Sequence, residues 1–185
     1  MGKPSFGTRV CIQDGDENVL PRREIGEVCV QGGQVMREYW KKKDATAEAL
    51  RGGWYDSGDA GYLDEGGYLF LVDRVKDMIV TGGENVYSAE VESAISTHPD
   101  VAQVAVIGIP HDTWGEAVHA VVVQNPGSRI TVEVVIEHAR EYIAGYKIPK
   151  SVEFRDEPLP LSGAMKVLKK DLRAPHWAGK EKGIG

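Results

Sequence analysis

The hydrophobic pattern of the chain changes once, at Asp73-Arg74-Val75-Lys76-Asp77, and this change restricts the fold more than any other feature. Before it, short alternating segments such as TRVCIQD and YLFLVD are separated by Gly-, Asp- and Glu-rich turns, a pattern typical of small β-structures. After it, helical and strand patterns follow one another. We therefore expect two regions of different construction, joined by a segment in which four of five residues are charged.

The first region is expected to contain one helix, in DATAEALRGG, with Asp44 as its N-cap and Gly52 beyond its end. The second is expected to contain helices in SAEVESAISTH and TVEVVIEHAREYI, capped by Ser88 and Thr131. Strands are expected in VAQVAVIGI and AVHAVVVQ, and a short basic helix in KVLKKDLR.

This order predicts an α+β fold. A small β-rich subdomain, built like a distorted barrel, occupies residues 1–73, and a compact domain with a small sheet flanked by helices occupies residues 79–185. Residues 74–78 are read either as an exposed turn or as a hinge, since a few residues between two compact bodies can absorb a large backbone rotation.

Charge and cysteine content exclude several classes of protein. With 22 basic and 28 acidic residues the net charge is −6, which argues against a nucleic-acid partner because phosphate binding needs a basic surface. Cys11 and Cys29 lie on alternating stretches without metal-ligand spacing and are expected to be buried thiols. Because no apolar run is long enough to cross a bilayer and no signal region opens the chain, we expect a cytoplasmic protein, with peripheral attachment to a membrane left open.

Several catalytic motifs are absent from the sequence. Neither GxxxxGK[ST], GxGxxG, GxSxG nor HExxH occurs. Gly82-Gly83 is therefore read as a turn with positive φ angles rather than as a phosphate loop. No metal site is expected, because the histidines lack ligand spacing; these are His98, His111, His119, His138 and His176. Asp59 is either a turn residue or a carboxylate that accepts two hydrogen bonds from a vicinal diol.

Motifs that run through most of the chain resemble one enzyme family. Four segments are similar to the C-terminal third of acyl-CoA synthetases of the adenylate-forming (AMP-binding) superfamily. They are GWYDSGDAGYLDEGGYLFLVDRVKDMIVTGGENVYSAEVE, GIPHDTWGEAV, YKIPKSVEF and LPLSGAMKVLKKDLR. The resemblance implies an acid–thiol ligase, of fatty-acyl type: a carboxylate reacts with ATP to give acyl-AMP, and CoA then displaces AMP. ATP with Mg²⁺ and CoA are the implied substrates, and no tightly bound cofactor is implied for this stretch.

The same resemblance implies roles for individual residues. Asp59 and Arg74 match nucleotide-binding positions at the ribose, and Lys76 matches the hinge residue about which the C-terminal domain turns between the two half-reactions. Gly82, Gly83 and Glu84 are implied to line the path of the CoA pantetheine arm. Lys166 matches the catalytic lysine of adenylation, although Met165 stands where the family usually has glycine.

The family's phosphate loop and acyl pocket have no counterpart in this chain. The resemblance therefore implies a C-terminal fragment that is inactive without an N-terminal domain carrying the ATP and acyl sites. Two alternatives are half of a split ligase and a non-catalytic interaction module. A subdomain without its packing partner is expected to expose apolar surface, through which two copies can form a homodimer or swap elements. A final set of basic residues is read either as an anion-binding surface or as a solvated face; it comprises Lys166, Lys169, Lys170, Arg173, Lys180 and Lys182.

Overall fold

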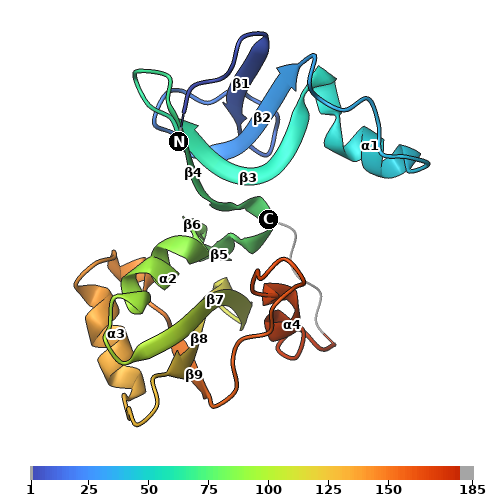
Figure 1. The fold of residues 1–185 in the computed structure, drawn as a ribbon. Coiled ribbons are helices and arrows are strands. Elements are labelled where there is room, and N and C mark those ends of the chain that lie inside the picture. The colour runs from blue at the N-terminus through green and yellow to red at the C-terminus, as the bar shows by residue number, and fades with distance from the viewer. Residues whose placement is uncertain (1, 180–185) are drawn as a thin grey trace. The chain divides into compact units, whose positions relative to one another are not determined.

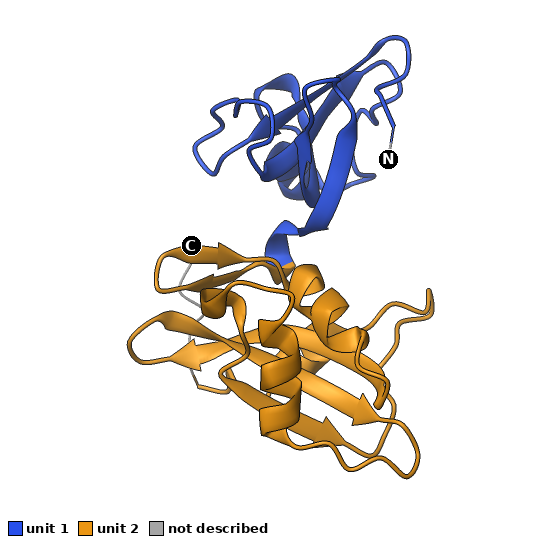
Figure 2. Cartoon of the chain, turned by 90° about the vertical axis from the view of Figure 1, so that its left-hand side faces the viewer, with its two compact units in different colours: residues 1–76 blue, residues 77–185 orange. Residues whose placement is uncertain are grey.

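A computed structural model of the chain describes residues 2–179. The chain divides between Lys76 and Asp77 into two compact units, residues 1–76 and 77–185 (Figure 2). The division lies inside the segment 74–78 that the sequence suggests as a hinge. Rotation about that segment remains a prediction.

Unit 1 is a four-stranded antiparallel sheet in the order β1-β2-β3-β4 (Figure 1). Its strands are Thr8–Gln13, Gly26–Gly32, Tyr55–Leu63 and Leu69–Arg74. One helix, α1 (Lys43–Ala49), and a 3₁₀ turn at Arg51–Gly53 lie between β2 and β3. The expected barrel is wrong: in the described residues β1 and β4 have no pairing with each other, so the sheet is open.

The core of unit 1 is small. Ile12, Val28 and Leu63 form its buried centre. Cys11 and Cys29 face each other across β1 and β2, and both are buried free thiols, as the sequence predicts. The same unit leaves large apolar side chains exposed, among them Trp40 at 79%.

Unit 2 is built on a five-stranded sheet whose two longest strands, β7 (Val101–His111) and β8 (Gly115–Gln124), pair antiparallel. A short hairpin, β5 (Ile79–Thr81) and β6 (Glu84–Val86), meets β8 at Gly115. On the same edge of β8, β9 (Ser151–Arg155) pairs in parallel with residues His119 to Val123. The mixed α+β class predicted from the sequence is confirmed.

The two faces of this sheet carry different covers, because alternate strand residues point to opposite sides. Helices α2 (Ser88–Ser96) and α3 (Val132–Arg140) pack on one face, where Val91, Ile95 and Val135 join Val118 and Ala120 of β8. The other face holds Ile107 and Val121 against Leu159 and Leu172, the latter from α4 (Lys169–Arg173). Each fully buried aliphatic side chain of this size stabilises the fold by about 1.5–3 kcal/mol.

The predicted helix caps have mixed outcomes. Thr131 caps α3, accepting a hydrogen bond from the Val134 amide. Asp44 is not a cap, because α1 begins one residue earlier and Asp44 lies in its first turn. Ser88 is also not a cap: it is the first helical residue of α2, and its hydroxyl accepts from Lys169 Nζ at 2.7 Å. None of the helices in the described part of the chain has the length and apolar composition needed to span a bilayer.

Candidate functional site

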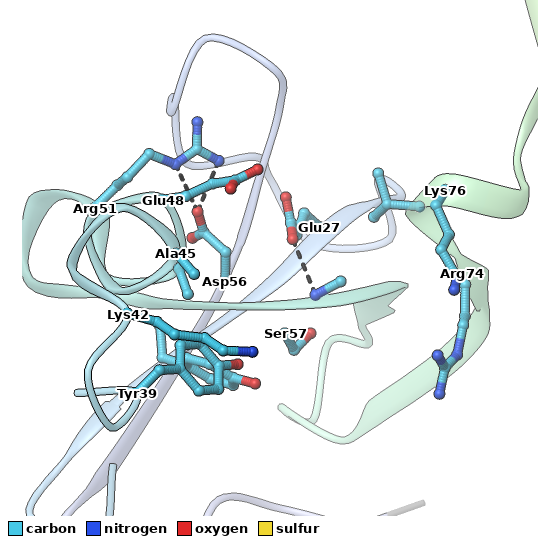
Figure 3. A pocket seen from close by; sticks show the side chains of 14 residues that line it. Glu27, Tyr39, Lys42, Ala45, Glu48, Arg51, Asp56, Ser57, Arg74 and Lys76 are labelled. Atoms are coloured by element: carbon cyan, nitrogen blue, oxygen red, sulfur yellow. Dashed lines mark hydrogen bonds and ion pairs between the residues drawn. The ribbon is translucent and has the colours of Figure 1, made fainter. Parts of the chain in front are cut away.

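A hollow of about 640 Å³ opens in unit 1 beside the last residues of β4 (Figure 3). Ser57 and Gly58 of β3 line it, together with Tyr39 from the segment before α1. Arg74 and Lys76 line its other side. Basic and acidic side chains therefore meet around a space that is open to solvent.

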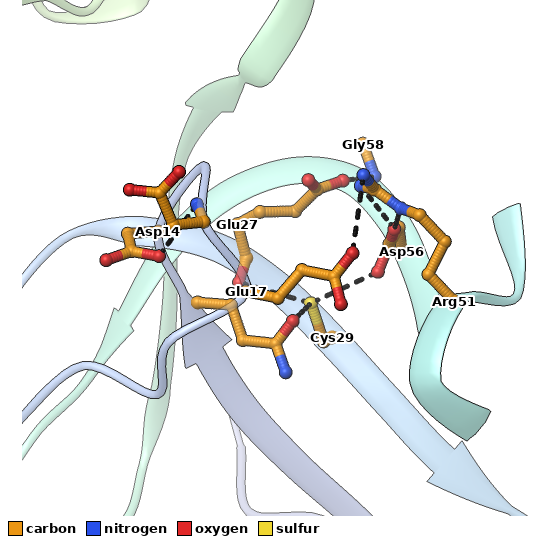
Figure 4. Close-up of polar contacts among 9 residues, drawn as sticks. Asp14, Glu17, Glu27, Cys29, Arg51, Asp56 and Gly58 are labelled. Carbon is orange, nitrogen blue, oxygen red and sulfur yellow. Dashed lines mark hydrogen bonds and ion pairs between the residues drawn. The ribbon is translucent and has the colours of Figure 1, made fainter. Parts of the chain in front are cut away.

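Two carboxylates in the wall of this hollow are held in fixed positions (Figure 4). Asp56 receives hydrogen bonds from Arg51 at 2.7 Å, and the Cys29 thiol also donates to it, at 3.4 Å. Glu27 accepts from the Gly58 amide at 3.0 Å. Burial raises the pKa of Glu27, as do the neighbouring Asp56 and Asp59, while the Gly58 amide and Arg51 oppose this.

Asp59 and Arg74 lie next to each other because β3 and β4 pair them directly. Arg74 Nε is 3.7 Å from Asp59 Oδ1, and the two side chains are 48% and 37% exposed, respectively. A carboxylate and a guanidinium that are paired but accessible can exchange this contact for the hydroxyls of a bound diol. The structure thus brings together two residues that the sequence pairs, and their contact with a nucleotide remains a prediction.

Lys76 lies in a 3₁₀ turn, Val75–Asp77, that directly precedes β5. It is exposed, and the boundary between the two units follows it. A turn at this place is compatible with a pivot, whose motion is a prediction.

Gly82 and Gly83 form the two-residue turn of the β5–β6 hairpin. Their φ angles are +60° and +86°, the left-handed values that a type I′ hairpin turn requires at both positions. The Gly82 amide donates to the Trp114 carbonyl at 3.0 Å, which holds the turn against the end of β8. Hairpin geometry alone therefore explains both glycines; a path for CoA along this loop and Glu84 remains a prediction.

Lys166 lies at a tight turn rather than on a helix, because α4 begins only at Lys169. Ser162 closes the turn: its amide donates to the Lys166 carbonyl at 2.8 Å, and its hydroxyl accepts from the Lys166 amide at 3.2 Å. Met165 is held at φ +59°, a region that glycine adopts without steric cost. The turn leaves the Lys166 side chain exposed to solvent, where an ammonium group can reach a ligand.

The basic residues of α4 are not a uniform solvated face. Lys169 Nζ lies 2.7 Å from Glu92 Oε1, and Arg173 donates to Asp77 Oδ1 at 3.1 Å. These four side chains are between 13% and 23% exposed, so both pairs are largely buried. Lys170 is exposed, and Lys180 and Lys182 lie outside the described residues.

The sequence did not indicate the polar wall of the hollow. Tyr39, Arg51 and Glu27 come from three separate segments, and none belongs to a recognisable motif. The one available signal is Arg51, a charged residue directly before Gly52-Gly53, and it points to a turn rather than to a site.

Comparisons with known proteins find similar enzymes. Residues 90–166 match the family model of the AMP-binding enzyme C-terminal domain. The chain is 48% identical over 172 residues to a feruloyl-CoA synthase of Amycolatopsis sp, covering 93% of this chain and 35% of the relative. It is 44% identical over 173 residues to a long-chain-fatty-acid–CoA ligase of Escherichia coli O6:H1, covering 94% and 30%.

A solved structure of a similar protein has the same fold over almost the whole chain. The crystal structure of ATP-bound MatB from Rhodopseudomonas palustris superposes with a TM-score of 0.88 at 37% identity, covering 98% of this chain and 36% of that one. The chain thus spans about a third of the length of each of these similar proteins.

Proposed function

Because the chain belongs to the adenylate-forming, AMP-binding enzyme superfamily, we propose that it supplies the hinge and C-terminal domain of an ATP-dependent carboxylate–CoA ligase. The observation that carries this proposal is the adjacency of Asp59 and Arg74 at the edge of an open hollow, directly before the boundary between two compact units. A nucleotide held there would lie next to the segment about which the second unit turns.

In the first half-reaction, Asp59 and Arg74 bind the ribose hydroxyls of ATP. The Lys166 ammonium donates hydrogen bonds to the attacking carboxylate and to the α-phosphate, where negative charge shifts as acyl-AMP forms and pyrophosphate leaves. Because Lys166 lies on a turn tied to Ser162, its backbone is fixed while its side chain reaches outward. Removal of one such preorganised contact costs about 10²-fold or more in rate.

In the second half-reaction, rotation at Lys76 replaces Lys166 with the Gly82-Gly83-Glu84 turn at the nucleotide. The narrow hairpin tip leaves room for the pantetheine arm, whose thiol attacks the acyl carbon and releases AMP. ATP with Mg²⁺, the carboxylate and CoA are substrates in this scheme. We assign the acyl group to the fatty or aromatic acids, the classes that similar ligases act on by name.

The exposed apolar side chains of unit 1 fit a surface that the remainder of a larger ligase covers. Trp40, Phe70 and Leu71 are 79%, 37% and 44% exposed. If this surface instead pairs two copies of the chain, light scattering will show a dimer at high concentration. A clean monomer would exclude the homodimer and leave the larger ligase as the partner.

A graft tests the proposal directly. This chain replaces the matching C-terminal part of the Amycolatopsis feruloyl-CoA synthase, and ATP-dependent formation of the CoA thioester is measured. Activity above that of the truncated host supports a ligase domain, and Asp59→Ala in the graft should weaken ATP binding at unchanged fold. A folded graft without activity would favour the interaction module.

A further inference from the structure

Three side chains that are far apart in the sequence meet on one face of the unit 2 sheet. They are His119 of β8, Glu153 of β9 and His176 of the segment after α4. One nitrogen or oxygen atom from each lies within 4.8 Å of the other two, and among residues 2–179 no other group of three such side chains meets this condition. None of the three takes part in the proposed ligase chemistry.

Strand pairing explains why His119 and Glu153 converge. In the parallel β8–β9 pair, His119 lies opposite Ser151 and Val121 lies opposite Glu153. Residues two apart on a strand share a face, so His119 and Glu153 point to the same side of the sheet. Their closest atoms, His119 Nε2 and Glu153 Oε2, are 3.9 Å apart.

His176 is brought to the same place by the segment that follows α4. Its amide donates to the Arg173 carbonyl at 3.1 Å, which continues the turn of the helix. Its neighbour Trp177 donates from Nε1 to the Gly108 carbonyl of β7 at 3.0 Å. The imidazole rings of His119 and His176 then have centroids 5.0 Å apart.

The decisive observation is the state of His119. The residue is 5% exposed, and its Nδ1 is hydrogen-bonded to Ser151 Oγ at 2.7 Å. Its Nε2 is buried, makes no hydrogen bond and faces Glu153 and His176. A buried ring nitrogen without a hydrogen-bond partner lowers the stability of the fold, and a ligand bound to this nitrogen would remove that cost.

We propose that His119, Glu153 and His176 bind one Zn²⁺ ion. Two imidazole nitrogens and a carboxylate oxygen form an open zinc site, in which water takes the fourth position. The bond between His119 Nδ1 and Ser151 is the outer contact that fixes the ring of a metal-binding histidine. Mg²⁺ and Ca²⁺ are disfavoured, because both prefer oxygen ligands throughout.

The geometry needs only a small adjustment. With Zn–N and Zn–O bonds of about 2.0–2.2 Å, ligand atoms of a tetrahedral site lie about 3.4 Å apart. The Glu153 carboxylate can move toward the two histidines, because its side chain is 45% exposed. The same exposure lets the ion enter from solvent. Burial lowers the pKa of His119, with the nearby His176 acting in the same direction and Glu153 opposing it. The ion would join the segment after α4 to β8 and β9.

Zinc binding by the metal-free 185-residue chain tests this proposal, with a chromophoric zinc chelator as competitor. We expect one Zn²⁺ per chain. Glu153→Gln and His176→Gln should each weaken binding at least about 10-fold. The matched control is His138→Gln, which breaks a second histidine pair: the rings of His98 and His138 are also 5.0 Å apart. This control should bind zinc with unchanged affinity.

Cobalt gives a readout independent of affinity. Co²⁺ in a four-coordinate site has a strong visible d–d absorption, which should be present in the wild-type chain and in His138→Gln and absent in His176→Gln. Circular dichroism of the metal-free variants checks the fold, and the exposed Glu153→Gln keeps the test valid if His176→Gln fails to fold. Absence of stoichiometric zinc binding would overturn the proposal. So would equal affinity in wild type and Glu153→Gln, or loss in His138→Gln alone.

Discussion

The ion pair between Asp77 and Arg173 should be a principal link between the start of unit 2 and its C-terminal helix. Arg173 is the last residue of α4 and donates to Asp77 Oδ1 at 3.1 Å. The side chains are 17% and 15% exposed, so water screens the pair weakly. The contact also links the residue after Lys76 to the helix that follows Lys166.

The burial of this ion pair determines how much stability the chain should lose when one partner is removed. Exposed pairs contribute about 0.2–1 kcal/mol, whereas loss of one partner of a fully buried pair costs about 3–5 kcal/mol. For a pair that keeps a sixth of its surface exposed, Asp77→Ala should lower the free energy of unfolding by about 2 kcal/mol. In a unit of roughly 100 residues, this corresponds to a fall of about 10 °C in the melting temperature.

Scanning calorimetry of the chain measures this shift. The control is Asp112→Ala, at an exposed aspartate in the β7–β8 turn, which should change stability by no more than about 0.5 kcal/mol. The double variant Asp77→Ala/Arg173→Met should recover part of the loss, because it also removes the buried guanidinium that has lost its Asp77 contact. Equal melting temperatures for Asp77→Ala and Asp112→Ala, or strictly additive effects in the double variant, would show that Asp77 and Arg173 do not stabilise each other.

Two further predictions concern strain and buried charge. Met165→Gly should raise the free energy of unfolding, measured by urea titration, by up to about 1 kcal/mol. The substitution removes the penalty of about 1–2 kcal/mol for a left-handed backbone and adds the smaller entropic cost of glycine. Met165→Val should lower the free energy of unfolding, and the reverse order of the two variants would contradict a left-handed backbone at this position. Glu27→Gln keeps an acceptor for the Gly58 amide. The folded-state pKa of Glu27 lies above its ordinary value of 4.5, so its favourable contribution exists below pH 4.5 and is lost as pH rises through the shifted pKa. The variant should therefore gain stability relative to wild type at pH 7 but not at pH 4, and an equal difference at both pH values would count against a raised pKa of this partly buried carboxylate.

The sequence predicts the elements of this fold well because hydrophobic alternation reports burial directly. The strands around Val106 and Val121, and the cap at Thr131, depend on neighbours within a few residues. Asp59 and Arg74 are indicated by the family resemblance, and the hairpin of β3 and β4 pairs them directly.

Long-range contacts explain what the sequence could not predict. Ser88 fails as a cap, and its hydroxyl pairs instead with Lys169, 81 positions later. His119 and His176 show no ligand spacing because the fold, not the sequence order, brings them together. The expected barrel was wrong because local patterns predict strands but not whether the two edge strands pair.

We propose that Lys166 serves the first half-reaction and not the second. In the grafted ligase, ATP–pyrophosphate exchange measures adenylation, and thioester formation from a synthetic acyl-adenylate and CoA measures the second step alone. Lys166→Ala should reduce exchange by about 10²-fold or more and leave thioester formation unchanged, while Lys170→Ala, at an exposed lysine of α4, should affect neither. Equal loss of both half-reactions in Lys166→Ala, or loss of neither, would overturn the role proposed for Lys166.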